Sequence, residues 1–180
     1  MNAATQTLTL PGSAGGIEAL LDVPADGIVR GTAVIAHPHP LFGGTMQNKV
    51  VQTLARAFVQ CGWQAVRFNF RGVGASAGTY DEGRGEAEDM LAVVEQVAPT
   101  GPLALAGFSF GAFVTSHVAQ TLAPVRSLDK LVLVGTAASR FVVAPVAPEL
   151  HEKTLVLHGE QDDTVPLSSV MDWARPQSLP

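Results

Sequence analysis

The chain has 180 residues, of which 47% are apolar and 15% charged, and its formal net charge is −5 at pH 7. This length fits a single domain spanning residues 1–180, and the apolar content excludes a disordered chain. The negative charge and the lack of a Lys/Arg run argue against a nucleic acid or a membrane surface as partner, and without a signal peptide or an apolar span we expect a cytoplasmic location.

Apolar segments of strand length alternate with longer segments of helical periodicity. Strands are predicted at residues 5–10, 17–23, 31–36, 63–70, 103–106, 131–134 and 155–157, and helices at 49–60, 83–97, 112–122 and 168–174. Two strands followed by alternating strands and helices predict a mostly parallel sheet with an antiparallel start and helices on both faces. Ser168 is the predicted N-cap of the last helix. The only cysteine, Cys61, is expected to be a small buried residue.

Residues 107–111 read Gly-Phe-Ser-Phe-Gly, which fits G-x-S-x-G and lies between a predicted strand and a predicted helix. So abrupt a turn strains the backbone of Ser109 and makes its side chain project above the sheet. Glycines at 107 and 111 remove Cβ atoms that would collide in the turn. The N–H of Phe110 then becomes one oxyanion donor. The alternative is a glycine-flanked serine at an ordinary strand–helix corner.

Residues 158–166 read His-Gly-Glu-Gln-Asp-Asp-Thr-Val-Pro. They resemble the H-G-x-x-D-x-x-V-P segment of α/β-hydrolases, in which the aspartate orients the catalytic histidine. The resemblance implies an α/β-hydrolase fold with Ser109 as nucleophile and Asp162 as the acid of the catalytic triad. Both ends of the pattern select Asp162 and leave Asp163 as a solvated turn residue. Only 18 residues, Thr136 to Lys153, separate the last two strands, too few for a cap domain.

The third strand ends at His37-Pro38-His39-Pro40. The resemblance implies that the second oxyanion N–H comes from His39, and the two prolines have no N–H to offer. A metal bound by His37 and His39 is the competing interpretation, but no acidic partner lies nearby in the sequence. The double His-Pro and the segment 69–76 resemble small bacterial α/β-hydrolases of the dienelactone-hydrolase-like group. In that segment Arg71 is expected to be structural.

The family order is Ser, Asp, His, but none of the five histidines follows Asp162. They are His37, His39, His117, His151 and His158. The resemblance implies a further strand, the histidine and a helix, so we expect a C-terminally incomplete hydrolase; a non-catalytic relative is the alternative. The strand at 155–157 would then have an unpaired edge, which we expect to favour a homodimer or aggregation.

These features together predict a serine hydrolase that cleaves small carboxylic esters through an acyl-enzyme on Ser109. This chemistry needs no cofactor or metal, because the nucleophile and a water molecule suffice. A thioesterase or a peptidase on the same scaffold is an alternative, since the fold does not select the acyl substrate. A non-catalytic binding protein that uses the same pocket is another.

Overall fold

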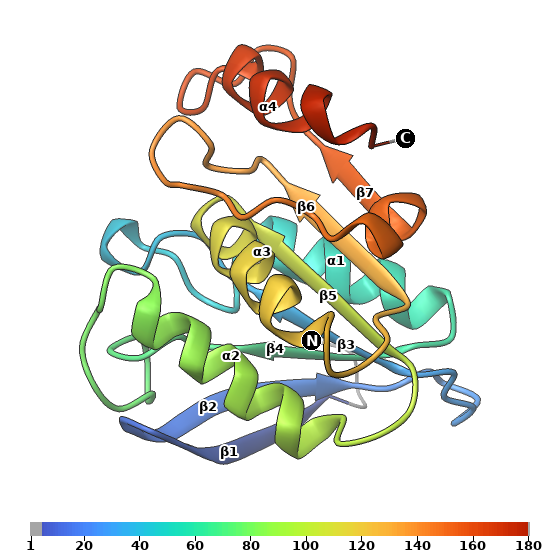
Figure 1. Cartoon of the computed structure of the whole chain (residues 1–180). Helices are drawn as coiled ribbons and strands as arrows, with labels where there is room; N and C mark the ends of the chain where they lie inside the picture. The colour runs from blue at the N-terminus through green and yellow to red at the C-terminus, as the bar shows by residue number, and fades with distance from the viewer. Residues whose placement is uncertain (1–4, 180) are drawn as a thin grey trace.

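The computed structural model describes residues 5–179 and contains a seven-stranded sheet in the order β1-β2-β4-β3-β5-β6-β7 (Figure 1). The strands are β1 (Gln6–Gly12), β2 (Gly15–Asp22), β3 (Thr32–Ala36), β4 (Gln64–Phe68), β5 (Leu103–Phe108), β6 (Lys130–Val134) and β7 (Thr154–Leu157). The α-helices are α1 (Lys49–Gln60), α2 (Arg84–Val97), α3 (Phe110–Leu122) and α4 (Leu167–Ala174). Three short 3-10 helices are η1 (Pro40–Phe42), η2 (Pro148–Lys153) and η3 (Arg175–Gln177).

The strand directions agree with the sequence pattern. β1 and β2 form an antiparallel hairpin, β2 pairs antiparallel with β4, and the pairs from β4 through β3, β5, β6 and β7 are all parallel. A mostly parallel sheet with an antiparallel start is therefore confirmed. Every predicted strand and helix is present, with ends shifted by at most two residues, whereas the three 3-10 helices were not predicted.

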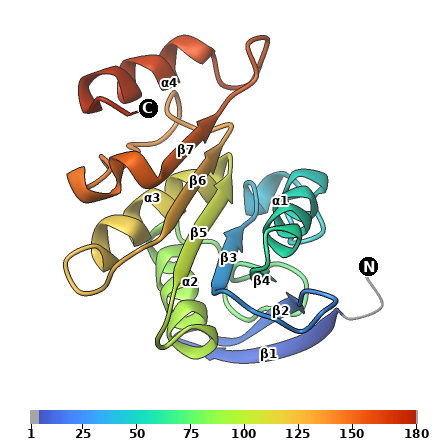
Figure 2. The ribbon, with the colours of Figure 1, turned by 90° about the vertical axis from the view of Figure 1, so that its right-hand side faces the viewer.

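Helices cover both faces of the sheet (Figure 2). On one face α1 packs Val51 and Ala55 against Ile35, Ala65 and Ala106 of the central strands. On the other face α2 and α3 cover a larger apolar cluster. Because both faces are covered, all five residues of β3 are buried, as expected for a central parallel strand.

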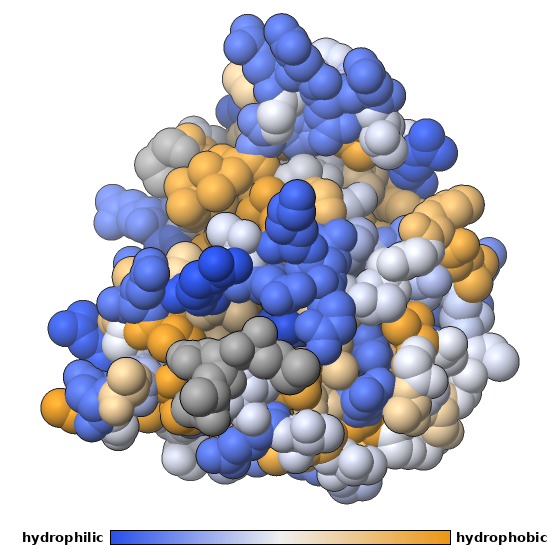
Figure 3. Space-filling model, turned by 180° about the vertical axis from the view of Figure 1, so that it is seen from behind, coloured by the Kyte–Doolittle hydropathy of each residue, from blue (hydrophilic) through white to orange (hydrophobic). Residues whose placement is uncertain are grey.

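The sheet ends at β7, which within residues 5–179 pairs on one side only, with β6. Leu155 is 51% exposed and Leu157 45% exposed, although both lie in a strand. Viewed from behind, the surface shows apolar patches beside the polar C-terminal elements (Figure 3). Among the described residues, the outer edge of β7 therefore has no strand beside it, and the expected homodimer or aggregation stays a prediction. No helix among the described residues is long and apolar enough to cross a membrane.

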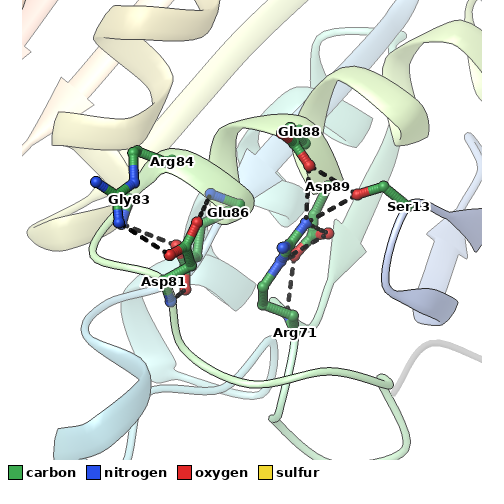
Figure 4. Close-up of polar contacts among 9 residues, drawn as sticks. Ser13, Arg71, Asp81, Gly83, Arg84, Glu86, Glu88 and Asp89 are labelled. Carbon is green, nitrogen blue, oxygen red and sulfur yellow. Dashed lines mark hydrogen bonds and ion pairs between the residues drawn. The ribbon is translucent and has the colours of Figure 1, made fainter.

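Two carboxylates of α2 hold the long loop that follows β4 (Figure 4). Asp89 is buried and pairs with the guanidinium of Arg71 at 2.8 Å, and it also accepts the Arg71 backbone N–H at 2.9 Å. Glu86 is fully buried and accepts the N–H groups of Asp81 and Gly83, both at 2.8 Å. Arg71 thus has the structural role predicted for it, at the start of the loop, while Glu86 fixes the end.

Two local predictions are wrong. Cys61 is exposed, because it follows the last turn of α1 as its C-cap and lies outside the apolar face of that helix. Ser168 is not an N-cap, since α4 begins at Leu167 and Pro166 precedes it without a side-chain cap. The Ser169 hydroxyl instead donates to the carbonyl of Pro166 at 2.7 Å.

Candidate active site

The turn between β5 and α3 consists of Ser109 alone. Its φ is +56° and its ψ −115°, a backbone conformation that residues with a Cβ rarely adopt. Hydrogen bonds maintain it: the Ser109 N–H donates to the carbonyl of Val134 at 2.9 Å, and the Ser109 carbonyl accepts from Ala112 at 3.0 Å. The strained turn predicted from the motif is therefore present.

The glycines on either side of Ser109 lie where a side chain has no room. A Cβ on Gly107 would collide with the carbonyl oxygen of Gly111. A Cβ on Gly111 would lie 2.5 Å from the carbonyl oxygens of both Ala36 and His37 at the end of β3. The spacing of the motif thus follows from the close approach of α3 to the neighbouring strand.

A cavity of about 910 Å³ opens above the carboxyl ends of the parallel strands, and Ser109, Phe110, His39 and Asp162 all line it. Ligands of parallel α/β sheets bind at this edge, where the loops that follow the strands meet. The structure therefore brings together all four residues that the sequence predicted for the site. The aromatic rings in its wall are Phe42, Phe108, Phe110 and Phe141.

Two backbone N–H groups at the cavity have no acceptor within the part of the chain that the structure describes. In residues 5–179 neither the N–H of His39 nor that of Phe110 donates a hydrogen bond. Phe110 is the first residue of α3, where N–H groups lack a partner within the helix and the dipole favours negative charge. These two donors are the ones that the sequence predicted for an oxyanion.

Asp162 and Asp163 differ in position. Oδ1 of Asp162 accepts the N–H groups of Thr164 at 2.9 Å and Val165 at 2.8 Å, while no hydrogen bond is made to its Oδ2 by any described residue. Asp163 is exposed and does not line the cavity. Oδ1 of Asp162 is thus held by two backbone N–H groups, while Oδ2 is free to accept a hydrogen bond.

His37 is fully buried at the end of β3, and two hydrogen bonds fix its tautomer. Nε2 accepts the N–H of Phe70 at 3.1 Å, so the ring proton is on Nδ1, which donates to the carbonyl of Pro38 at 2.6 Å. Burial lowers the pKa of His37 from 6.5 to about 4. A neutral ring with both nitrogens engaged has no free lone pair for a metal or for a proton from Ser109.

The other histidines also have protein partners. Nε2 of His117, His151 and His158 lies 2.8, 3.0 and 2.7 Å from backbone carbonyls. His158 Nε2 is 3.9 Å from Asp162 Oδ2, beyond hydrogen-bond distance. Across residues 5–179 no histidine is hydrogen-bonded to Ser109 or to Asp162, and no three His, Cys, Asp or Glu side chains gather to hold a metal.

A sequence family model described as Hydrolase_4, serine aminopeptidase S33, matches residues 29–154. The lidless α/β serine hydrolase XC6422 of Xanthomonas campestris superposes with a TM-score of 0.86 at 36% identity, over 99% of this chain and 82% of that one. The chain belongs to the α/β-hydrolase superfamily. The expected α/β-hydrolase fold is thereby confirmed, and the dienelactone-hydrolase-like group stays a prediction.

Two further relatives of this α/β-hydrolase come from other bacteria. An α/β serine hydrolase homologue of Coxiella burnetii has a TM-score of 0.83 and 38% identity, over 97% of this chain and 83% of that one. The uncharacterized protein RP471 of Rickettsia prowazekii (strain Madrid E) is 41% identical over 90 residues, which are 48% of this chain and 38% of that protein. The match thus spans less than half of the Rickettsia protein.

Sequence reasoning missed a residue that contacts the ring of His39 in this α/β-hydrolase. The hydroxyl of Tyr80 lies 3.3 Å from Nε2 of His39, and its ring centroid is 5.8 Å from that of Phe110. Tyr80 follows a glycine-rich loop and belongs to no motif. No pattern in the sequence relates it to His39, 41 residues earlier.

The packing of Gly111 predicts a loss of stability in Gly111→Ala. We expect the free energy of unfolding to fall by about 3 kcal/mol, as in severe overpacking, because the new methyl group meets two fixed carbonyls. Gly159→Ala is the matched control, since the nearest atom to its Cβ is 3.8 Å away. Urea unfolding followed by circular dichroism measures both. Equal losses in the two variants would contradict the proposed packing.

The buried His37 predicts a loss of stability in mild acid. Its pKa in the folded chain is about 4, whereas an unfolded histidine has its ordinary value of 6.5. The unfolded state therefore binds more protons, and stability present above pH 6.5 is lost as the pH falls toward 4, by about 3 kcal/mol in total. Urea unfolding between pH 7 and 4.5 measures the free energy of unfolding at each pH. In His37→Gln this free energy should fall less steeply with decreasing pH than in the unsubstituted chain. Parallel pH profiles of the two proteins would refute it.

Proposed function

We propose that this chain is a serine hydrolase that cleaves small carboxylic esters through an acyl-enzyme on Ser109. In this reaction the Ser109 Oγ attacks the ester carbonyl carbon and gives up its proton to a base. The tetrahedral intermediate then collapses, and the alcohol leaves with that proton. Water releases the carboxylic acid from the acyl-enzyme in a second, equivalent step.

The observation that carries this proposal is the meeting of a strained serine and two unused N–H groups in one cavity. The N–H groups of His39 and Phe110 lack protein acceptors among residues 5–179. Donors held in place before the reaction stabilise the negative oxygen of the tetrahedral intermediate, and each is worth about 10²- to 10³-fold in rate. We therefore assign His39 and Phe110 to the oxyanion hole.

Asp162 is proposed to orient the base. With Oδ1 fixed by two backbone N–H groups, the free Oδ2 can accept the N–H of an imidazole whose other nitrogen faces Ser109. None of the five histidines, all within the described part of the chain, has its ring hydrogen-bonded there. The proposal therefore requires an imidazole between Asp162 and Ser109 for fast turnover.

The charges of the cavity favour an ester over the N-terminus of a peptide. An aminopeptidase has to neutralise the ammonium group of its substrate, usually with a carboxylate. Among the described residues that line the cavity, Asp162 is the only acidic side chain, and its free oxygen is already assigned to the base. The lining aromatic rings instead offer apolar contact to an uncharged acyl or alcohol group.

Free imidazole should accelerate ester hydrolysis by this chain, because it can donate to the free oxygen of Asp162 and accept the proton of Ser109. We expect p-nitrophenyl butyrate hydrolysis to rise with added imidazole and to saturate. In Ser109→Ala the rate should equal that of imidazole in buffer, because loss of a triad serine removes about 10⁶-fold in kcat in an intact enzyme. Initial rates at several imidazole concentrations measure both.

A fluorophosphonate probe separates this function from a non-catalytic pocket. The probe should label Ser109 faster when imidazole is present, and peptide mass spectrometry identifies the labelled residue. Labelling that does not depend on imidazole and falls elsewhere would sink the assignment of the nucleophile. A chain that binds esters without any turnover would instead support the non-catalytic alternative.

Substitution of the two adjacent aspartates should have different effects on the rate. In an intact triad, Asp→Asn costs about 10⁴-fold in kcat. Asp162→Asn should therefore remove most of the imidazole-dependent rate, whereas Asp163→Asn, at an exposed position outside the cavity, should retain it. The same p-nitrophenyl butyrate assay compares them. If Asp163 were the sensitive position, the assignment of the acid would be wrong.

A further inference from the structure

The imidazole of His39 is held in one orientation by two hydrogen bonds. Its Nδ1 accepts the N–H of Leu41 at 3.2 Å, and because a backbone N–H can only donate, this nitrogen carries no proton. The neutral ring therefore has its proton on Nε2, which donates to the hydroxyl of Tyr80 at 3.3 Å. Burial lowers the pKa of His39, which favours this neutral form.

Tyr80 contacts both residues assigned to the oxyanion hole. Its ring centroid is 5.0 Å from that of His39 and 5.8 Å from that of Phe110. The backbone of His39 has little freedom of its own, since it lies between two prolines with φ −51° and ψ 123°. A hydrogen bond to its ring can therefore fix the whole His39 segment relative to α3.

The position of Tyr80 is itself fixed by the framework of α2. The next residue, Asp81, donates its N–H to the buried carboxylate of Glu86 at 2.8 Å, and Arg71 holds the other end of the loop on Asp89 (Figure 4). Tyr80 is thus attached to a rigid helix, while His39 belongs to the short segment after β3. The Tyr80–His39 contact is a polar link between these two parts, in addition to the bond from the Phe70 N–H to His37 at the start of the loop.

We propose that Tyr80 is a positioning residue of the oxyanion hole: its hydroxyl holds the His39 ring, and through it the His39 N–H, at the distance from Phe110 that an oxyanion requires. This inference rests on the proposed function. Tyr80 acts through His39 and donates nothing to the reacting atoms. Its hydroxyl should therefore affect the chemical step more than substrate binding.

Tyr80→Phe tests the inference, because it removes the hydroxyl and keeps the ring. In the imidazole-dependent hydrolysis of p-nitrophenyl butyrate, kcat should fall about tenfold with KM nearly unchanged, less than the 10²-fold or more that loss of a whole oxyanion donor costs. The ¹⁵N signals of the His39 ring should change as Nε2–H loses its acceptor. Thr79→Val removes an exposed hydroxyl from the same loop and is the matched control. It should change neither kcat nor the ¹⁵N signals of the His39 ring.

The outcomes separate this inference from the proposed function. An unchanged kcat and unchanged His39 signals in Tyr80→Phe would overturn the positioning role. A higher KM at constant kcat would also overturn it, because Tyr80 would then belong to substrate binding. If the unsubstituted chain shows no imidazole-dependent hydrolysis, the proposed function fails and the oxyanion role fails with it, whereas the ¹⁵N signals still decide whether Tyr80 holds the ring.

Discussion

The site depends on the contact between the start of α3 and the end of β3. Gly111 lies against the carbonyls of Ala36 and His37, an approach that excludes any Cβ. Because β3 and β5 are adjacent parallel strands, with Ala36 paired to Gly107, the segments that follow them emerge side by side. His39 and Phe110 therefore become neighbours although 71 positions separate them. The strain at Ser109 persists because the surrounding sheet and helix over-determine the turn.

A second feature recurs in the loops that follow the strands, where carboxylates accept backbone N–H groups and so hold the loops in place. Glu86 fixes the residues after Tyr80, Asp89 fixes Arg71, and Asp162 fixes its own turn. A bond from a backbone N–H to a charged oxygen is stronger than one between neutral groups. These bonds hold the loops in place before a substrate arrives, which is what the proposed electrostatic stabilisation of an intermediate requires.

The sequence predicted the elements and the motif residues because each depends on local pattern. The alternation of strands and helices, the glycines around Ser109 and the Val-Pro after Asp162 are all visible within a few positions. It failed at two helix ends, where exposure and capping depend on the folded geometry: Cys61 is exposed as the C-cap of α1, and α4 begins before Ser168. The Tyr80–His39 contact also escaped, because a long loop without periodicity brings the two residues together.

The sequence alone does not decide whether one of the five histidines is the catalytic base, and the hydrogen bonds of their rings give the answer for the described chain. His37 lies beside the site in sequence, yet its two hydrogen bonds and its buried ring keep it neutral and occupied. His158 is close to Asp162, but its Nε2–H is directed to the carbonyl of Val165. His39 reaches the cavity with Nδ1 already accepting a backbone N–H, so its ring acts as a structural link. In the proposed function, stabilisation of an oxyanion and proton transfer are therefore separate tasks. The N–H groups of His39 and Phe110 would perform the first, while the second needs an imidazole that can reach the free oxygen of Asp162.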